Sequence, residues 1–141
     1  MLLLHDNNEK GCFVIPPIES YFPNLMPFIT FLVDEAKQGR LSDWDDAAVQ
    51  VHAFFTAEMM DKMEATIPGW RHMSSYQDGK TLIHVMLVFA SLLMRPEYQN
   101  ANDQQQTIIK WIVLYHDLGK IIVGGRGDLV HGFRSATLVA Q

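Results

Sequence analysis

The chain has 141 residues, of which 48% are hydrophobic and 19% are charged, a composition that fits one globular domain with its own core and excludes disorder. Its net charge of −5, with 11 basic residues scattered along the chain, excludes a generic nucleic-acid surface, which requires clustered Lys and Arg. The single cysteine, Cys12, cannot form an internal disulfide and therefore favours a reducing, cytoplasmic setting.

The N-terminal part of the chain is predicted to be an arm followed by a helix. Residues 1–20 have no steady hydrophobic period and include Pro16 and Pro17, which favours an irregular arm. Residues 23–39 are predicted to be helical, because Pro23 suits the first turn of a helix and Gly39 suits the position just after the last turn.

One continuous helix is predicted next, within residues 41–69. Ser42 and Asp45 have the spacing of a capping pair, and Pro68 with Gly69 ends the segment. Apolar residues recur along it at helical spacing: Trp44, Ala48, Val51, Phe55 and Met59. The acidic residues near its start suit the positive end of a helix dipole, which explains them without a metal site.

Two central helices are predicted in the second half. Residues 81–94 are apolar on almost every face and end before Arg95 and Pro96. A polar loop follows at residues 97–106, and Asp103 with Gln106 is predicted to cap a helix over about residues 104–116. A helix that is apolar all round belongs in the middle of a bundle, and residues 85–94 are too few to span a bilayer. No strand alternation is seen, so the predicted fold class is all-α.

Two histidines and one aspartate stand out in these central helices. His84 lies within the first, and His116 and Asp117 close the second. Taken alone, His84 is more often a core histidine, and a His-Asp pair is easily matched by chance. A buried carboxylate is costly unless it is paired or bound to a metal. Facing each other in a bundle core, the three residues would suit a divalent ion such as Mn, Fe, Zn or Mg.

The pattern resembles the HD-domain superfamily over about residues 81–141, with HV at residues 84–85, YHDLGK at residues 115–120 and HGFRSA at residues 131–136. The resemblance implies a helical bundle of HD-domain type in residues 81–141. Residues 1–80 lie outside the resemblance and are predicted to be an arm and a helical extension that packs on this core, so that the chain forms one structural unit. It also implies a metal-dependent phosphohydrolase with one or two ions, in which metal-activated water cleaves a phosphate ester, often of a nucleotide.

The resemblance assigns roles residue by residue. His84, His116 and Asp117 match the first three metal ligands, and Asp117 would also orient or deprotonate the attacking water. Lys120 would neutralise phosphate charge, although a lysine near a helix end also suits the dipole. His131 would bind a second metal or face substrate, and the alternative is a surface residue at a helix start. Arg134 would grip phosphate, or would simply be solvated.

One departure from the superfamily pattern leaves alternatives open. The pattern closes with an aspartate on a downstream helix, whereas after Asp117 this chain has only Asp128, in the loop before His131. One expectation is a piece of a longer protein, with a bundle truncated at its C-terminus that could form homo-oligomers. The other is a catalytically inactive HD-like module that binds a nucleotide or a protein in signalling. His131 also keeps open a di-iron oxygenase centre.

Overall fold

The computed structural model describes residues 5–6, 13–72 and 79–118. These residues are mostly helical, which confirms the predicted all-α class. The helices are α1 (Leu25–Lys37), α2 (Trp44–Phe54), α3 (Ala57–Thr66), α4 (Lys80–Leu93), α5 (Pro96–Gln99) and α6 (Asp103–Tyr115), with 3-10 turns η1 (Ile18–Ser20) and η2 (Trp70–His72). A small antiparallel pair of two-residue strands, β1 (His5–Asp6) and β2 (Phe13–Val14), precedes them.

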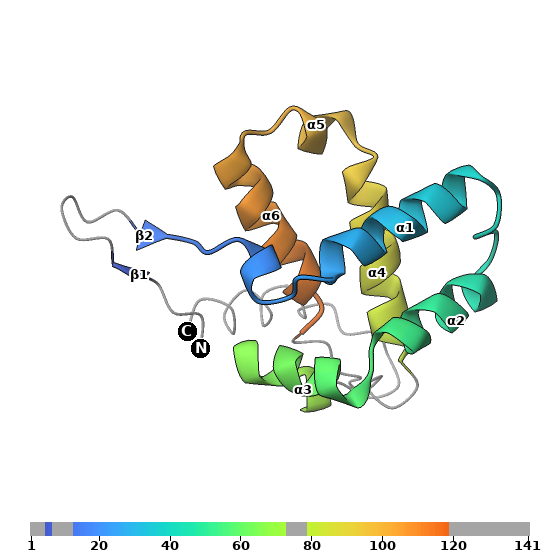
Figure 1. Cartoon of the computed structure of the whole chain (residues 1–141), viewed down its shortest axis with the longest axis horizontal. Helices are drawn as coiled ribbons and strands as arrows, with labels where there is room; N and C mark the ends of the chain where they lie inside the picture. Colours follow the sequence, from blue (N-terminus) through green and yellow to red (C-terminus); the bar gives the residue numbers. More distant parts are fainter. Residues whose placement is uncertain (1–4, 7–12, 73–78, 119–141) are drawn as a thin grey trace, which may run out of the picture.

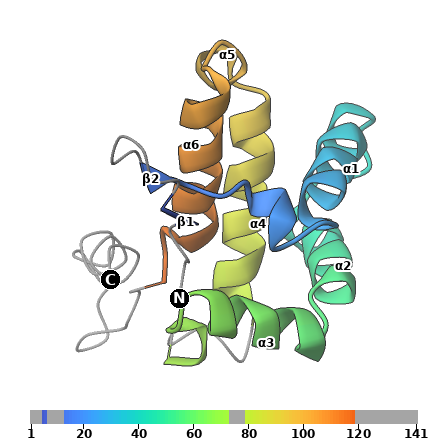
Figure 2. The ribbon, with the colours of Figure 1, turned by 60° about the vertical axis from the view of Figure 1, so that its left-hand side comes forward.

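The helix α4 lies at the centre of the bundle. It contacts α1 and α2 on one side and α6 on the other, and α5 connects it to α6 at the far end (Figure 1). Figure 2 shows α4 and α6 side by side and antiparallel, with α3 crossing beneath the ends of both. Half of the positions of α4 are buried, on more than one face: Thr81, Leu82, Ile83, Val85, Met86, Phe89 and Ala90. This central position is the one expected for a helix with so few polar residues.

The first predicted helix agrees with α1, except that Pro23 lies before the N-cap Asn24 and not in the first turn. The second was predicted as one helix and is two. The backbone leaves the helical conformation at Phe55 (φ −86°, ψ 79°), and the Thr56 hydroxyl accepts a hydrogen bond of 3.3 Å from the Met59 N–H at the start of α3. Phe55 instead packs edge-on against Phe54 (centroids 5.0 Å apart), which stacks on Phe28 of α1 at 4.1 Å. The aromatic contacts with α1 accompany the break between α2 and α3.

The cap of α2 was predicted one residue too early. Asp43, not Ser42, is the N-cap, and its carboxylate accepts a hydrogen bond of 2.9 Å from the Asp46 N–H. Ser42 donates its N–H (3.1 Å) and its hydroxyl (3.0 Å) to the Asp46 carboxylate, and these bonds lower the pKa of Asp46 below its usual value. The acidic residues therefore serve the start of a helix, as predicted.

The cap of α6 is also displaced by one residue, but in the opposite direction, because it was predicted one residue too late. Asn102 and Gln105 form a reciprocal capping box with bonds of 2.9 and 3.1 Å, whereas Asp103 and Gln106 were predicted to do so. Within the predicted polar loop, Pro96–Gln99 form the single turn α5. In both caps a neighbouring polar residue takes the predicted role, because a shift of one residue preserves the three-residue spacing.

The arm before α1 is held against α6. The Trp111 indole N–H donates to the Pro16 carbonyl at 2.8 Å, and Lys110 Nζ lies 2.7 Å from Glu19 Oε1. Burial acts to raise the pKa of Glu19, but the hydrogen bond and charge of Lys110 outweigh it, so the pKa lies below its usual value. Ile18 between them is fully buried in the common core.

Within the described ranges, no helix is long and apolar enough to cross a membrane.

Candidate metal site

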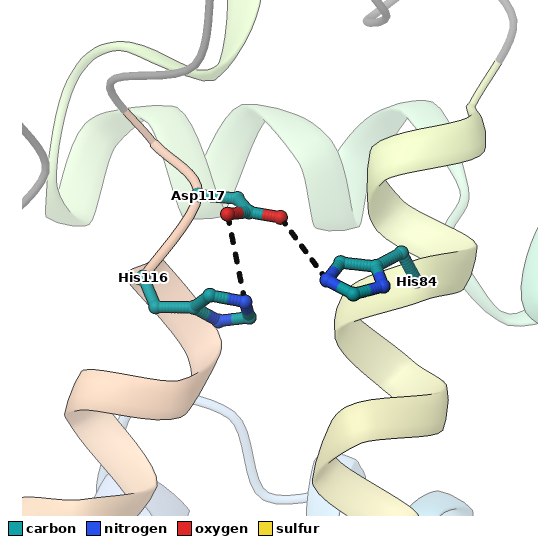
Figure 3. A group of neighbouring side chains, drawn as sticks. All are labelled: His84, His116 and Asp117. Atoms are coloured by element: carbon teal, nitrogen blue, oxygen red, sulfur yellow. Dashed lines mark ion pairs between the residues drawn. The ribbon is translucent and has the colours of Figure 1, made fainter. Parts of the chain in front are cut away.

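The three predicted ligands come from adjacent ends of two antiparallel helices. His84 lies one turn into α4, His116 caps the C-terminal end of α6, and Asp117 follows it. Because α4 and α6 run in opposite directions, the beginning of one lies beside the end of the other. Figure 3 shows the three side chains directed toward one another from the two helices, as predicted from the sequence.

The carboxylate of Asp117 lies between the two imidazoles. Its Oδ2 is 3.4 Å from His84 Nε2 and its Oδ1 is 3.5 Å from His116 Nε2, while the ring centroids are 5.6 Å apart (Figure 3). The side chain of Asp117 is 2% exposed, against 45% for His84 and 29% for His116. One potential ligand atom from each residue lies within 4.8 Å of the others. The site thus consists of one buried carboxylate, that of Asp117, and two partly exposed imidazoles.

The tautomer of His116 is determined by a backbone contact. Its Nδ1 lies 2.6 Å from the Val113 carbonyl oxygen. A carbonyl can only accept, so Nδ1 carries the hydrogen, and in the neutral ring Nε2 presents a lone pair to Asp117. A lone pair and a carboxylate oxygen repel each other unless positive charge lies between them. A cation between the Nε2 lone pair and the Asp117 carboxylate would bind both, and a backbone bond to Nδ1 is typical of metal-bound histidines.

The spacing of Asp117 from each histidine is close to that of two donors on one metal ion. Two donors on one ion, with bonds of about 2.1 Å at tetrahedral or octahedral angles, lie about 3.0–3.4 Å apart. The separations of 3.4 and 3.5 Å, which run from different oxygens of Asp117, are close to this range and exceed the roughly 2.7–2.9 Å of a charge-assisted hydrogen bond. The three ligand atoms together are more widely spread, within 4.8 Å of one another. Two imidazoles and one carboxylate are a donor set for Zn, Mn or Fe. His84, His116 and Asp117 can therefore hold a divalent ion.

Sequence reasoning missed the residues that surround the end of α6. Tyr115 is fully buried, donates its hydroxyl to the Met63 carbonyl at 3.1 Å and packs against Trp70. Burial raises the pKa of the Tyr115 hydroxyl, so this group remains a donor at neutral pH. Gly69 was interpreted only as a helix end, yet it lies against Leu118. The adjacent Trp70, a large apolar residue directly after a helix-ending Pro-Gly pair, was the available signal.

Lys120, His131 and Arg134 lie outside the described residues, as does Asp128, and their proposed roles stay predictions. Comparisons of the chain with protein-family models, with curated proteins and with solved structures found no match. The HD-domain resemblance also stays a prediction.

Proposed function

We propose that the chain is a metal-dependent phosphohydrolase of the HD type that acts on a phosphate ester, with nucleotides as the expected substrate class. The observation that carries the proposal is the convergence of His84, His116 and Asp117, whose ligand atoms lie within 4.8 Å of one another. His84 and His116 are 32 positions apart in sequence, and the antiparallel packing of α4 on α6 brings their side chains together with Asp117.

Each residue has a distinct part in this proposal. Asp117 is the buried anionic ligand, and the imidazoles of His84 and His116 are the neutral ones. A divalent ion held by such a set supplies a water nucleophile near neutral pH and draws charge from a phosphoryl group. An oxygen of Asp117 that is not engaged as a ligand can orient that water or accept its proton. Lys120, with His131 and Arg134, would bind the phosphate.

The openness of the site favours catalysis over a structural ion. Structural zinc sites are closed by four protein ligands, whereas catalytic sites keep a position for water or substrate. Here three protein donors meet among the described residues, and the side chains of His84 and His116 are 45% and 29% exposed. A substrate can therefore approach from the side of the imidazoles.

The test has two stages. The purified chain should bind Mn²⁺, Fe²⁺, Co²⁺ or Zn²⁺ by elemental analysis after reconstitution, and His116→Ala or Asp117→Ala should lose most of it. His52→Ala is the matched control, because His52 is an exposed histidine of α2. Metal retained by both ligand variants would refute the site.

The metal-loaded protein should then be assayed against nucleoside mono-, di- and triphosphates, cyclic nucleotides and an aryl phosphate. Hydrolysis that requires metal and is lost in Asp117→Ala supports the proposal. Tight nucleotide binding without turnover would replace it with the HD-like signalling module.

A further inference from the structure

The two adjacent ligands lie where the hydrogen-bonding ladder of α6 stops. α6 ends at Tyr115, His116 is its C-cap, and Asp117 follows. Beyond the last turn a helix no longer determines side-chain directions, and a metal site needs its ligands held within a fraction of an ångström. Some other part of the molecule must therefore hold His116 and Asp117 in place.

The residues on both sides of the ligand pair contact one segment. Before the pair, the Tyr115 hydroxyl donates to the Met63 carbonyl at 3.1 Å, and the Tyr115 ring lies 6.1 Å from that of Trp70. After the pair, Leu118 lies so close to Gly69 that a Cβ there would be 3.0 Å from Leu118 Cγ and Cδ1. Residues 63–70, here called the clamp, therefore bracket His116 and Asp117.

The Glu64 carboxylate holds the turn of the clamp against α3. Glu64 of α3 accepts hydrogen bonds from the Gly69 N–H through Oε1 and from the Arg71 N–H through Oε2, each of 3.2 Å. These two bonds tie the turn after α3 back onto α3. Figures 1 and 2 show α3 lying across the ends of α4 and α6 where the site is found. The clamp is thus a closed unit that lies directly beside the ligand-bearing end of α6.

We propose that the clamp positions His116 and Asp117 for metal binding, and that Tyr115 of α6 is the positioning residue through which the clamp acts. The proposal rests on the metal site proposed above. It assigns a role to a part of the chain upstream of the segment that resembles the HD superfamily. The Tyr115 hydroxyl donates to the Met63 carbonyl, so it acts on the site through the backbone immediately before His116.

Tyr115→Phe tests this by removing the hydroxyl that donates to the Met63 carbonyl and that also shares a hydrogen bond with Thr66, both within the clamp. Cobalt(II) is the probe, because its visible spectrum reports coordination geometry. Disturbed outer contacts of a metal site weaken binding by roughly 10–100-fold, so the Co²⁺ dissociation constant of Tyr115→Phe should rise at least tenfold. Its spectrum at saturating Co²⁺ should change as well. A residue that only stabilised the fold would leave that spectrum unchanged.

Tyr98→Phe is the matched control, since Tyr98 is also buried but lies in α5, with its hydroxyl near Lys110. Its affinity and spectrum should equal those of the parent. Equal Co²⁺ affinity and spectra in the two variants would overturn the clamp and leave the metal site standing. A parent chain that binds no Co²⁺ would overturn both proposals.

Should circular dichroism show that Tyr115→Phe is unfolded, Glu64→Ala decides the question. Glu64 is partly exposed, so the fold should tolerate the change, and Glu58→Ala on the exposed first turn of α3 is its control. The clamp predicts weaker Co²⁺ binding and a changed spectrum for Glu64→Ala alone. Identical binding by both variants would refute it.

Discussion

A divalent metal should raise the melting temperature of this protein, and Asp117→Asn should remove most of that effect. Asp117 supplies the only anionic donor among the three converging residues, and its side chain is 2% exposed. The substitution keeps the shape of the side chain but replaces a carboxylate by a neutral amide. The unfolded chain has no preformed site, so binding stabilises the folded state.

The size of the effect follows from linkage. Metal at about 100 times its dissociation constant stabilises the folded state by about 2.7 kcal/mol. The entropy of unfolding near 60 °C is about 2.1 cal/mol/K per residue, or about 0.3 kcal/mol/K for 141 residues. The melting temperature should therefore rise by about 9 °C. If Asp117→Asn weakens binding about 100-fold, the same metal concentration stabilises by only about 0.4 kcal/mol, or about 1 °C.

The measurement is a thermal melt by circular dichroism, with and without Zn²⁺ or Co²⁺, on the parent, Asp117→Asn and Asp103→Asn. Asp103 is an exposed aspartate in the first turn of α6, at the opposite end from the site. Its variant can lose stability, but it should keep the full metal-dependent shift. An equal shift in Asp117→Asn and the parent would show that the ion binds elsewhere.

Two further predictions concern the arm and the glycines. The folded-state pKa of Glu19 lies below its usual 4.5, so its pairing with Lys110 stabilises the fold above that pH and is lost as the pH falls through the folded-state pKa. Glu19→Gln should lower the free energy of unfolding in urea by at most about 1 kcal/mol at neutral pH, because the Glu19 side chain is 41% exposed. In acid, where the Glu19 carboxylate is protonated, the substitution should cost nothing, and a cost that persists there would contradict this. Gly39→Ala and Gly79→Ala both strain a left-handed backbone by about 1 kcal/mol, but only at residue 79 would the new Cβ meet another side chain, at 2.6 Å from His52 Cε1. Because His52 is exposed and its ring can turn aside, Gly79→Ala should cost only slightly more than Gly39→Ala in the same unfolding assay. His52→Ala should remove that difference, and a difference that persists in the His52→Ala background would refute the contact.

The helical class and the central helix could be predicted because they depend on local sequence patterns, namely helical spacing without strand alternation and one almost wholly apolar segment. A helix with few polar residues, such as α4, is stable only when neighbours cover it, whatever the details of packing. The break at Thr56 could not be predicted, since the apolar stripe continues at the same period through Phe55 and Met59. There the stacking of Phe54 on Phe28, a contact between distant segments, accompanies two helices in place of one.

The candidate site also has one part that could be predicted from the sequence and one part that could not. His84, His116 and Asp117 were identifiable because charged or polar groups in apolar helices need partners, and partners were scarce. The clamp was not identifiable, because its hydrogen bond ends on the carbonyl of Met63. Every residue has a carbonyl, so such a contact leaves no trace in the choice of amino acid. Gly69 was only an ambiguous signal of the contact with Leu118, since a glycine after a helix is common for other reasons.

The hairpin of α4, α5 and α6 joins the ligands over a short length of chain. His84 and His116 are 32 positions apart, and the helices that carry them pack directly on each other. Contacts between segments close in sequence form quickly, because little loop-closure entropy is lost. The imidazoles should therefore meet early in folding, before α3 and the clamp dock from further upstream. Metal added during refolding should accordingly speed closure of the hairpin as well as stabilise the finished bundle.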